Sequence, residues 1–214
     1  MLKSILTFIL ALLLVACETK TETAAVQQPE SPQADTTQAV TAPAPDSSFM
    51  IVPGVSMGQI RVGDTSEKVT ATLGKPDSGD AAMGKALSVW VSKKQNAEPQ
   101  HTVSVFFSRN GTEMPANLFA RQIRINSPVF KTPEAIQTGS SLAAIRQHYR
   151  VAPFAYYLNK QQQRVYIFDD QAQGIAFEIT TPDSTCTAIT IHDKTKDITN
   201  SYIPLDLELI PVTN

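Results

Sequence analysis

The stretch GQIRVGDTSEKVTATLGKPD, residues 58–77, decides the fold that the sequence predicts. Gly63 stands at a position suited to a positive φ or to a close approach of the backbone. Asp64 follows it as the expected N-cap of a short helix, and Glu67 three residues later completes a pattern like a capping box. The phrase therefore predicts an extended lead-in, a glycine turn and the start of a helix.

The same phrase also contains the end of that helix. Val69 and Leu73 are spaced i, i+4 and give the helix an apolar edge. Gly74 is suited to the C′ position, and Pro76 prevents the helix from continuing.

A second stretch, AIQTGSSLAAIRQHY at residues 135–149, repeats this spacing without a gap. Its residues Ile136, Gly139, Ser141, Ile145 and Tyr149 fall opposite Ile60, Gly63, Thr65, Val69 and Leu73. We interpret the two stretches as an internal repeat.

Strand-like segments follow each helical phrase. After the first they cover residues 87–91, 102–108 and 120–127; after the second, residues 154–158, 164–169, 174–179 and 187–192. Several alternate apolar and polar side chains, which is typical of antiparallel strands with one face buried and the other in water. The predicted fold class is α+β: two tandem helix-plus-three/four-strand units share one antiparallel sheet, with the helices on one face.

The first phrase resembles a motif of the SmpA/OmlA (BamE-like) outer-membrane lipoproteins, chiefly through Gly63, Val69, Leu73, Gly74 and Pro76. A similar helix-and-strand unit, doubled, occurs in the beta-lactamase-inhibitory protein. The second stretch departs from the motif, because Tyr149 and Arg150 replace its Leu-Gly pair and no Pro follows. The resemblance implies a non-enzymatic scaffold that acts by protein contact in the cell envelope.

The N-terminus predicts export and a lipid anchor. Lys3 precedes an apolar run, residues 5–15, which is shorter than the roughly 20 residues that a membrane-spanning helix needs. The run ends in Leu-Val-Ala-Cys, which resembles a bacterial lipobox, so residues 1–16 are the expected signal peptide and Cys17 the lipidated first mature residue. Glu18 after this cysteine resembles lipoproteins bound for the outer rather than the inner membrane.

Residues 17–48 are the expected tether, rich in Thr, Gln, Ala and Pro and without an aromatic residue. As a random coil they would span about 30 Å. The remainder is divided into a first unit, residues 49–130, and a second, divergent unit, residues 131–214. The chain's net charge of −2 splits into +1 before Cys17, −4 in the tether and +1 beyond it, so no basic surface for nucleic acid is expected.

Catalytic motifs are weak. Residues 54–58 match the Gly-x-Ser-x-Gly nucleophile elbow, which needs a strand before Ser56 and a helix directly after it. Pro53 precedes the motif and helix signals begin only at Asp64, so a glycine-rich loop is the preferred interpretation and a small Ser56 esterase the alternative.

No metal or cofactor is expected. The three histidines, His101, His148 and His192, lack metal-ligand spacing, and His148 is expected at a helix C-terminus. Adjacent Asp169 and Asp170 are interpreted as a solvated hairpin turn. Cys186 has no partner if Cys17 is lipidated, and is interpreted as a small buried apolar residue.

Six aromatic residues in the strand segments could form a recognition surface or pack in the core: Trp90, Phe106, Phe107, Tyr156, Tyr157 and Tyr166. The sequence thus predicts a binding or assembly module that is anchored to the envelope through Cys17 and contacts an envelope protein. A periplasmic ligand-binding module is the further alternative.

Overall fold

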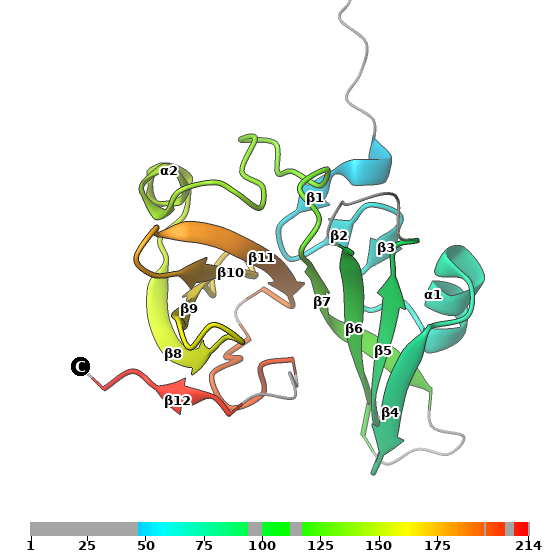
Figure 1. Ribbon diagram of the computed structural model, residues 1–214. Helices are drawn as coiled ribbons and strands as arrows, with labels where there is room; N and C mark the ends of the chain where they lie inside the picture. The colour runs from blue at the N-terminus through cyan, green and yellow to red at the C-terminus, as the bar shows by residue number, and fades with distance from the viewer. Residues whose placement is uncertain (1–46, 94–99, 112–116, 195, 204–207, 214) are drawn as a thin grey trace, which may run out of the picture. The chain divides into compact units, whose positions relative to one another are not determined.

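Strands make up most of the regular structure in the computed structural model (Figure 1). The structure describes residues 47–93, 100–111, 117–194, 196–203 and 208–213. The predicted signal peptide, Cys17 and nearly all of the tether lie outside these residues.

Nine strands form one sheet in which every neighbouring pair is antiparallel. Its order is β12-β8-β9-β10-β11-β7-β6-β5-β4. The bounds are β4 Ser78–Ala82, β5 Lys85–Val91, β6 Thr102–Arg109, β7 Leu118–Ile125, β8 Ala152–Leu158, β9 Arg164–Asp170, β10 Ile175–Thr180, β11 Thr185–His192 and β12 Ile210–Pro211. All seven predicted strand segments therefore lie in this sheet, whereas β4 and β12 were not predicted.

A second, three-stranded antiparallel sheet precedes it in the chain. It consists of β1 Ile51–Val52, β2 Ser56–Met57 and β3 Ile60–Arg61, and follows the short 3-10 helix Ser47–Phe49. Ile51, Met57 and Ile60 are buried, so this small sheet closes part of the core.

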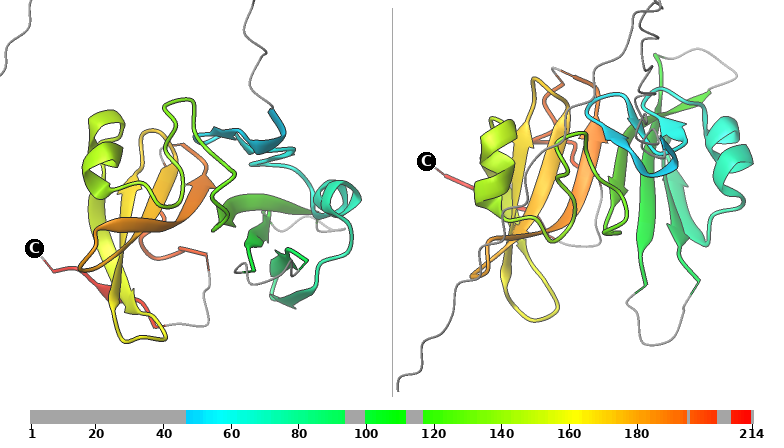
Figure 2. Two further views of the ribbon diagram at one scale, coloured as in Figure 1. Left: turned by 45° about the horizontal axis from the view of Figure 1, so that its top comes forward. Right: turned by 90° about the horizontal axis from the view of Figure 1, so that it is seen from above.

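Two α-helices occur among the described residues, α1 Ser66–Leu73 and α2 Leu142–His148. Each lies beside its own run of strands, α1 next to β4–β7 and α2 next to β8–β11 (Figures 1 and 2). The N-caps are Thr65 and Ser141, whose hydroxyls accept from backbone N–H groups three residues later. The prediction of Asp64 as N-cap is wrong: its carboxylate instead accepts from the N–H of Arg61, at 2.9 Å.

The predicted α+β class of two helix-plus-strand units is wrong. Twelve strands in two antiparallel sheets dominate the described residues, and the helices have only eight and seven residues. The physical reason is that each helix buries a single residue, Val69 or Ile145, so the core comes almost entirely from strands. The helix signals in the sequence were strong but local, and they overstated the helical share of the fold.

The two similar stretches nevertheless adopt similar local geometry. Gly63 has φ +89° and Gly139 has φ +92°. The N–H of Gly63 donates to Ala120 O and that of Gly139 to Cys186 O, each at 2.8 Å. The common phrase thus ties each helix start to a strand of the large sheet.

Apolar side chains are buried on both faces of this sheet. One face joins both helices in the larger cluster, which includes the fully buried Phe177 and Ile189. The other face belongs to a smaller cluster in which Ile167 and Ala176 pack with Ile198 and Ile203. The chain after β11 therefore covers part of the second face.

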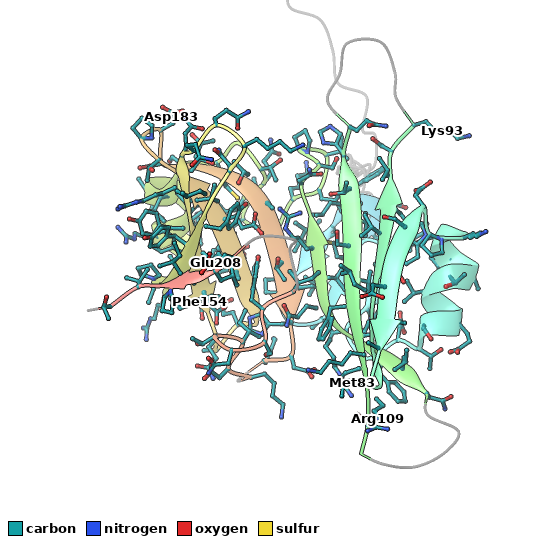
Figure 3. All side chains as sticks on the ribbon, turned by 60° about the horizontal axis from the view of Figure 1, so that its bottom comes forward. Met83, Lys93, Arg109, Phe154, Asp183 and Glu208 are labelled. Atoms are coloured by element: carbon teal, nitrogen blue, oxygen red, sulfur yellow. The ribbon has the colours of Figure 1, made fainter. Side chains whose placement is uncertain are left out.

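The β4–β5 hairpin marks one end of the β4–β7 strands. Met83, at its tip, is 94% exposed and has φ 52°, and Gly84 has φ 75°, so the two form the turn. Figure 3 shows Met83 and Arg109 at this end and Lys93 at the opposite end. Lys85, which follows the turn, lies at the rim of the cavity described below.

Candidate functional site

A polar strip runs along the junction between β7 and β11. Residues Gln122, Ile123, Arg124 and Ile125 pair with His192, Ile191, Thr190 and Ile189. Because successive strand residues point to opposite faces, the four isoleucines share one face and the four polar residues share the other. The isoleucines are buried in the larger cluster, as alternation predicts.

The polar face is covered by residues 196–203, which we call the C-terminal segment. The side-chain amide of Gln122 forms two hydrogen bonds with the C-terminal segment. Its Nε2 donates to Ser201 O, and its Oε1 accepts from Ile203 N at 2.6 Å. Tyr202 adds a hydroxyl contact to Thr190 at 2.9 Å. Gln122 and Thr190 are consequently buried, although they are polar residues on the face opposite the isoleucines.

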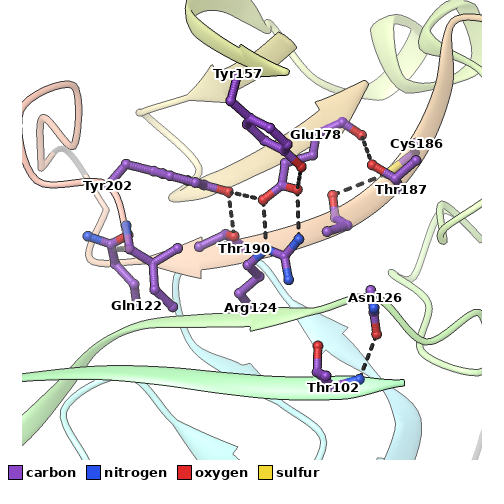
Figure 4. Close-up of polar contacts among 12 residues, drawn as sticks. Thr102, Gln122, Arg124, Asn126, Tyr157, Glu178, Cys186, Thr187, Thr190 and Tyr202 are labelled. Atoms are coloured by element: carbon purple, nitrogen blue, oxygen red, sulfur yellow. Dashed lines mark hydrogen bonds and ion pairs between the residues drawn. The ribbon is translucent and has the colours of Figure 1, made fainter. Parts of the chain in front are cut away.

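Beneath this segment lies a buried ion pair, drawn in Figure 4. Arg124 Nε and Nη2 donate to the two carboxylate oxygens of Glu178 at 2.6 and 2.7 Å. The hydroxyls of Tyr202 and Tyr157 donate to the same oxygens at 2.8 and 2.7 Å. Four donors therefore satisfy a carboxylate whose side chain has no exposed surface.

Burial and the ion pair shift the pKa values of Glu178 and of the two tyrosines that contact it. Burial alone would raise the pKa of Glu178, but the charge and hydrogen bonds of Arg124, with those of both tyrosines, outweigh it and hold the pKa below its ordinary value. Burial, followed by the charge of Glu178, raises the pKa of Tyr157 and of Tyr202. The network is fully paired and has no side chain free to react, so we assign it a structural role.

His192 ends the polar strip between two acceptors. Its Nε2 lies 3.0 Å from Asp169 Oδ1 and its Nδ1 lies 2.9 Å from Asp193 O. Asp170 also lies in β9 and accepts from the N–H of Arg150 at 2.8 Å. The prediction that Asp169 and Asp170 form a solvated hairpin turn is therefore wrong, because β9 extends through both and the turn begins after them.

An open cavity of about 600 Å³ lies between the sheet and the chain after β11. The strands contribute Lys85, Phe106 and Arg121, whereas the C-terminal segment contributes Lys196, Ile198 and Tyr202. The volume is within the range of small-molecule sites. Both apolar and charged side chains thus line the cavity. Local sequence patterns could not predict it, because its residues are far apart in the chain.

Arg121 is held in this cavity mostly by neutral partners. Its Nε donates to Ser108 Oγ at 3.1 Å, and its Nη2 donates to Asn110 Oδ1. Among the described residues, the carboxylate that forms an ion pair with it is that of Asp193, 3.8 Å from Nη1. The guanidinium is therefore fixed in position while its charge is only weakly compensated.

The six predicted aromatic residues do not form one surface. Trp90, Phe107 and Tyr157 are buried, and Phe106 lines the cavity. Tyr156 and Tyr166 are brought together as half-buried partners across β8 and β9, with ring centroids 5.4 Å apart.

Arg164 and Leu158, which the sequence did not single out, extend this pair. The Arg164 guanidinium lies 5.1 Å from the Tyr156 ring centroid, and Leu158 is 40% exposed. We call Tyr156, Leu158, Arg164 and Tyr166 the aromatic surface. Their common face follows from the β8–β9 register, in which Tyr156 pairs with Tyr166 and Leu158 with Arg164.

Ser56 lies in β2, paired with Val52 and Arg61. The chain continues into β3, and α1 begins only at Ser66, so the strand-to-helix turn of a nucleophile elbow is not formed. His148 ends α2, as predicted. Within the described ranges no three His, Cys, Asp or Glu side chains are grouped as metal ligands.

Cys186 is buried and free, and its Sγ contacts Ala188 O at 3.4 Å. Burial raises the pKa of its thiol, which agrees with the predicted small apolar role. Cys17, the predicted lipidation site, lies outside the described residues. No helix in the described part of the chain has the length and apolar character to cross a membrane.

No known family model matches this chain, and neither does a curated protein or a solved structure. The resemblance to the BamE-like lipoproteins stays a prediction from the sequence motif.

Proposed function

We propose that this protein is a non-enzymatic binding module of a Gram-negative envelope, anchored through Cys17 and binding an envelope protein through the aromatic surface. The lipobox-like sequence supports the anchor, and residues 17–48 supply the tether. The outer membrane is the proposed location because Glu18 follows the cysteine.

The observation that carries this proposal is the half-buried Tyr156–Tyr166 pair with Arg164 stacked on it. Tyrosine and arginine are enriched among the residues that dominate protein-binding energies. Such a pair offers apolar area at low cost in conformational entropy, and its hydroxyls remain able to form hydrogen bonds.

The charge of the aromatic surface indicates the partner's chemistry. Arg164 of β9 lies over Tyr156. Phe168 also belongs to β9, and the guanidinium of Arg146 on α2 lies 5.5 Å from its ring centroid. Neither arginine forms an ion pair with another described residue. The complementary partner is a protein surface that presents carboxylates beside apolar side chains.

An esterase using Ser56 has less support. Ser56 is buried in the middle strand of the small sheet, and its strand neighbours supply no base. We expect Ser56→Ala to have no effect in cells and a fluorophosphonate probe not to label the protein. Labelling that Ser56→Ala abolishes would favour the esterase instead.

Photocrosslinking in intact cells tests the proposed surface. A benzophenone amino acid at Leu158 or at Tyr166 is expected to capture the same envelope protein. The matched control is Val129, which is 57% exposed and follows β7. Arg164→Glu should abolish the crosslink while the melting temperature stays unchanged, because Arg164 is exposed.

Two results would contradict the proposal. Crosslinks of equal yield from Val129 would mean that capture is unspecific. Crosslinks only to residues 17–48 of the same chain would mean that the arginines hold the acidic tether, which carries a net charge of −4.

A deletion of about twenty tether residues should impair function and leave the fold intact, since the tether sets the reach of the module from the membrane. A harmless deletion, together with a Ser56→Ala phenotype at unchanged stability, would overturn the binding function.

A further inference from the structure

We infer that the cavity between β5–β7 and the C-terminal segment binds a small organic carboxylate, a monoanion with an apolar body. This site is separate from the aromatic surface, which lies on β8 and β9, and does not depend on it. The inference rests on the charge, the geometry and the apolar walls of the cavity.

The charged residues around the cavity indicate a single negative charge on the ligand. Apart from His192, which is paired with Asp169, Lys85, Arg121 and Lys196 are cationic and Asp193 and Asp197 are anionic, which leaves a net charge of +1. A monoanion balances this charge, whereas a dianion would be repelled by the two aspartates after neutralising the excess.

The cations differ in how they are paired. Lys85 and Lys196 form no ion pair with a described residue. The carboxylate of Asp197 is turned toward its own loop, where Oδ1 accepts from Thr199 N at 2.8 Å. The cavity therefore offers two exposed ammonium groups in addition to Arg121.

Arg121 supplies the fixed part of the site. Ser108 and Asn110 accept hydrogen bonds from it but carry no charge, so they orient the guanidinium without neutralising it. Asp193, at 3.8 Å, is too far for a good hydrogen bond. A ligand carboxylate thus meets a cation that is already positioned, which lowers the entropic cost of binding.

Apolar side chains provide the walls for the ligand's body. Phe106 is half-buried on the sheet side, and Ile198 and Tyr202 line the opposite side. The Tyr202 hydroxyl already bonds Thr190 and Glu178, and its ring packs against Phe154, so Tyr202 forms a fixed wall that offers little surface of its own. An aromatic or branched aliphatic body suits this arrangement.

Calorimetric titration of the full chain in a nonionic detergent tests the inference. The probe is phenylacetate, with phenylacetamide as the neutral control of equal shape and phenyl phosphate as the dianion. We expect phenylacetate to bind saturably. Phenylacetamide should bind at least about tenfold more weakly because it carries no charge. Phenyl phosphate should also bind more weakly because its two negative charges exceed the single positive charge of the cavity.

Exposed variants locate the binding without threatening the fold. Lys85→Gln and Lys196→Gln should each weaken phenylacetate binding by about fivefold, and Lys160→Gln on the β8–β9 hairpin should leave it unchanged. Asn110→Asp is the sharpest variant, because it keeps the hydrogen bond to Arg121 Nη2 and adds a charge that neutralises the guanidinium. It should weaken binding without lowering the melting temperature.

The inference is overturned if phenylacetate fails to bind saturably, if phenylacetamide binds equally well, or if the Lys85, Lys196 and Asn110 variants bind like the unmodified chain. Tighter binding of phenyl phosphate than of phenylacetate would assign the cavity to phosphate esters and overturn the carboxylate.

Discussion

Arg124 and Glu178 form a two-point ion pair across β11, although 54 positions separate them in the sequence. Arg124 belongs to β7 and Glu178 to β10, and in the intervening strand Thr190 pairs with Arg124 and Ala188 pairs with Glu178. The pair joins the strands that follow α1 to those that follow α2. The same network holds Tyr202 of the C-terminal segment, so one carboxylate links three parts of the chain.

Removing one partner of this pair should cost about 3–5 kcal/mol, because the other charge stays buried and unpaired. We therefore expect Arg124→Met and Glu178→Met each to lower the free energy of unfolding by that amount. The double variant should cost less than the sum of the single variants. Urea unfolding of the four proteins measures the coupling energy, and strict additivity would show that the two groups do not interact.

Acid should weaken the folded protein through Glu178. Its pKa is lowered in the folded state, so its contribution to stability is present above the unfolded value of about 4.3 and is lost as the pH falls through the folded pKa. Unfolding experiments below about pH 4.3 should show a shallower loss of stability for Glu178→Gln than for the unmodified chain. Equal slopes would mean that other carboxylates dominate.

Val69→Asp and Ile145→Asp should be comparably severe. Each replaces the single buried residue of its helix, with no exposed surface, by a carboxylate that has no partner in the apolar cluster. An unpaired buried charge costs several kcal/mol. Thermal unfolding gives the comparison, with the exposed helix positions Thr70 and Arg146 as sites for control substitutions. A mild effect at one buried site alone would show that the two helices contribute unequally.

Cys17→Ser should release the protein from membranes or leave its signal uncleaved, because the thioether to diacylglycerol forms only on cysteine. Fractionation and metabolic labelling with an alkynyl fatty acid provide the measurement. A Cys17→Ser protein that still takes up the label would place the lipid elsewhere.

The sequence by itself determined the local elements. Strand-like segments, several of them with period-two alternation, located seven strands of the large sheet, and Gly63 and Gly74 have the positive φ values of 89° and 83° that suit their roles at the two ends of α1. These predictions succeeded because glycine turns and strand patterns depend on residues close together in the chain. The same locality explains the wrong fold class, since a strong helix signal does not reveal how little of the core a two-turn helix provides.

Only the tertiary structure decided whether the second face of the sheet is buried or exposed to water. Gln122, Thr190 and Glu178 alternate with apolar residues and so lie on the face that this pattern would leave in water, yet all three are buried. Period two determines which side of a strand a residue occupies but not whether another segment covers that side. Residues 196–203 supply the cover, and they are held by hydrogen bonds to side chains as many as 81 positions away. The buried ion pair, the cavity and the positioned Arg121 all depend on that long-range closure, which no local pattern encodes.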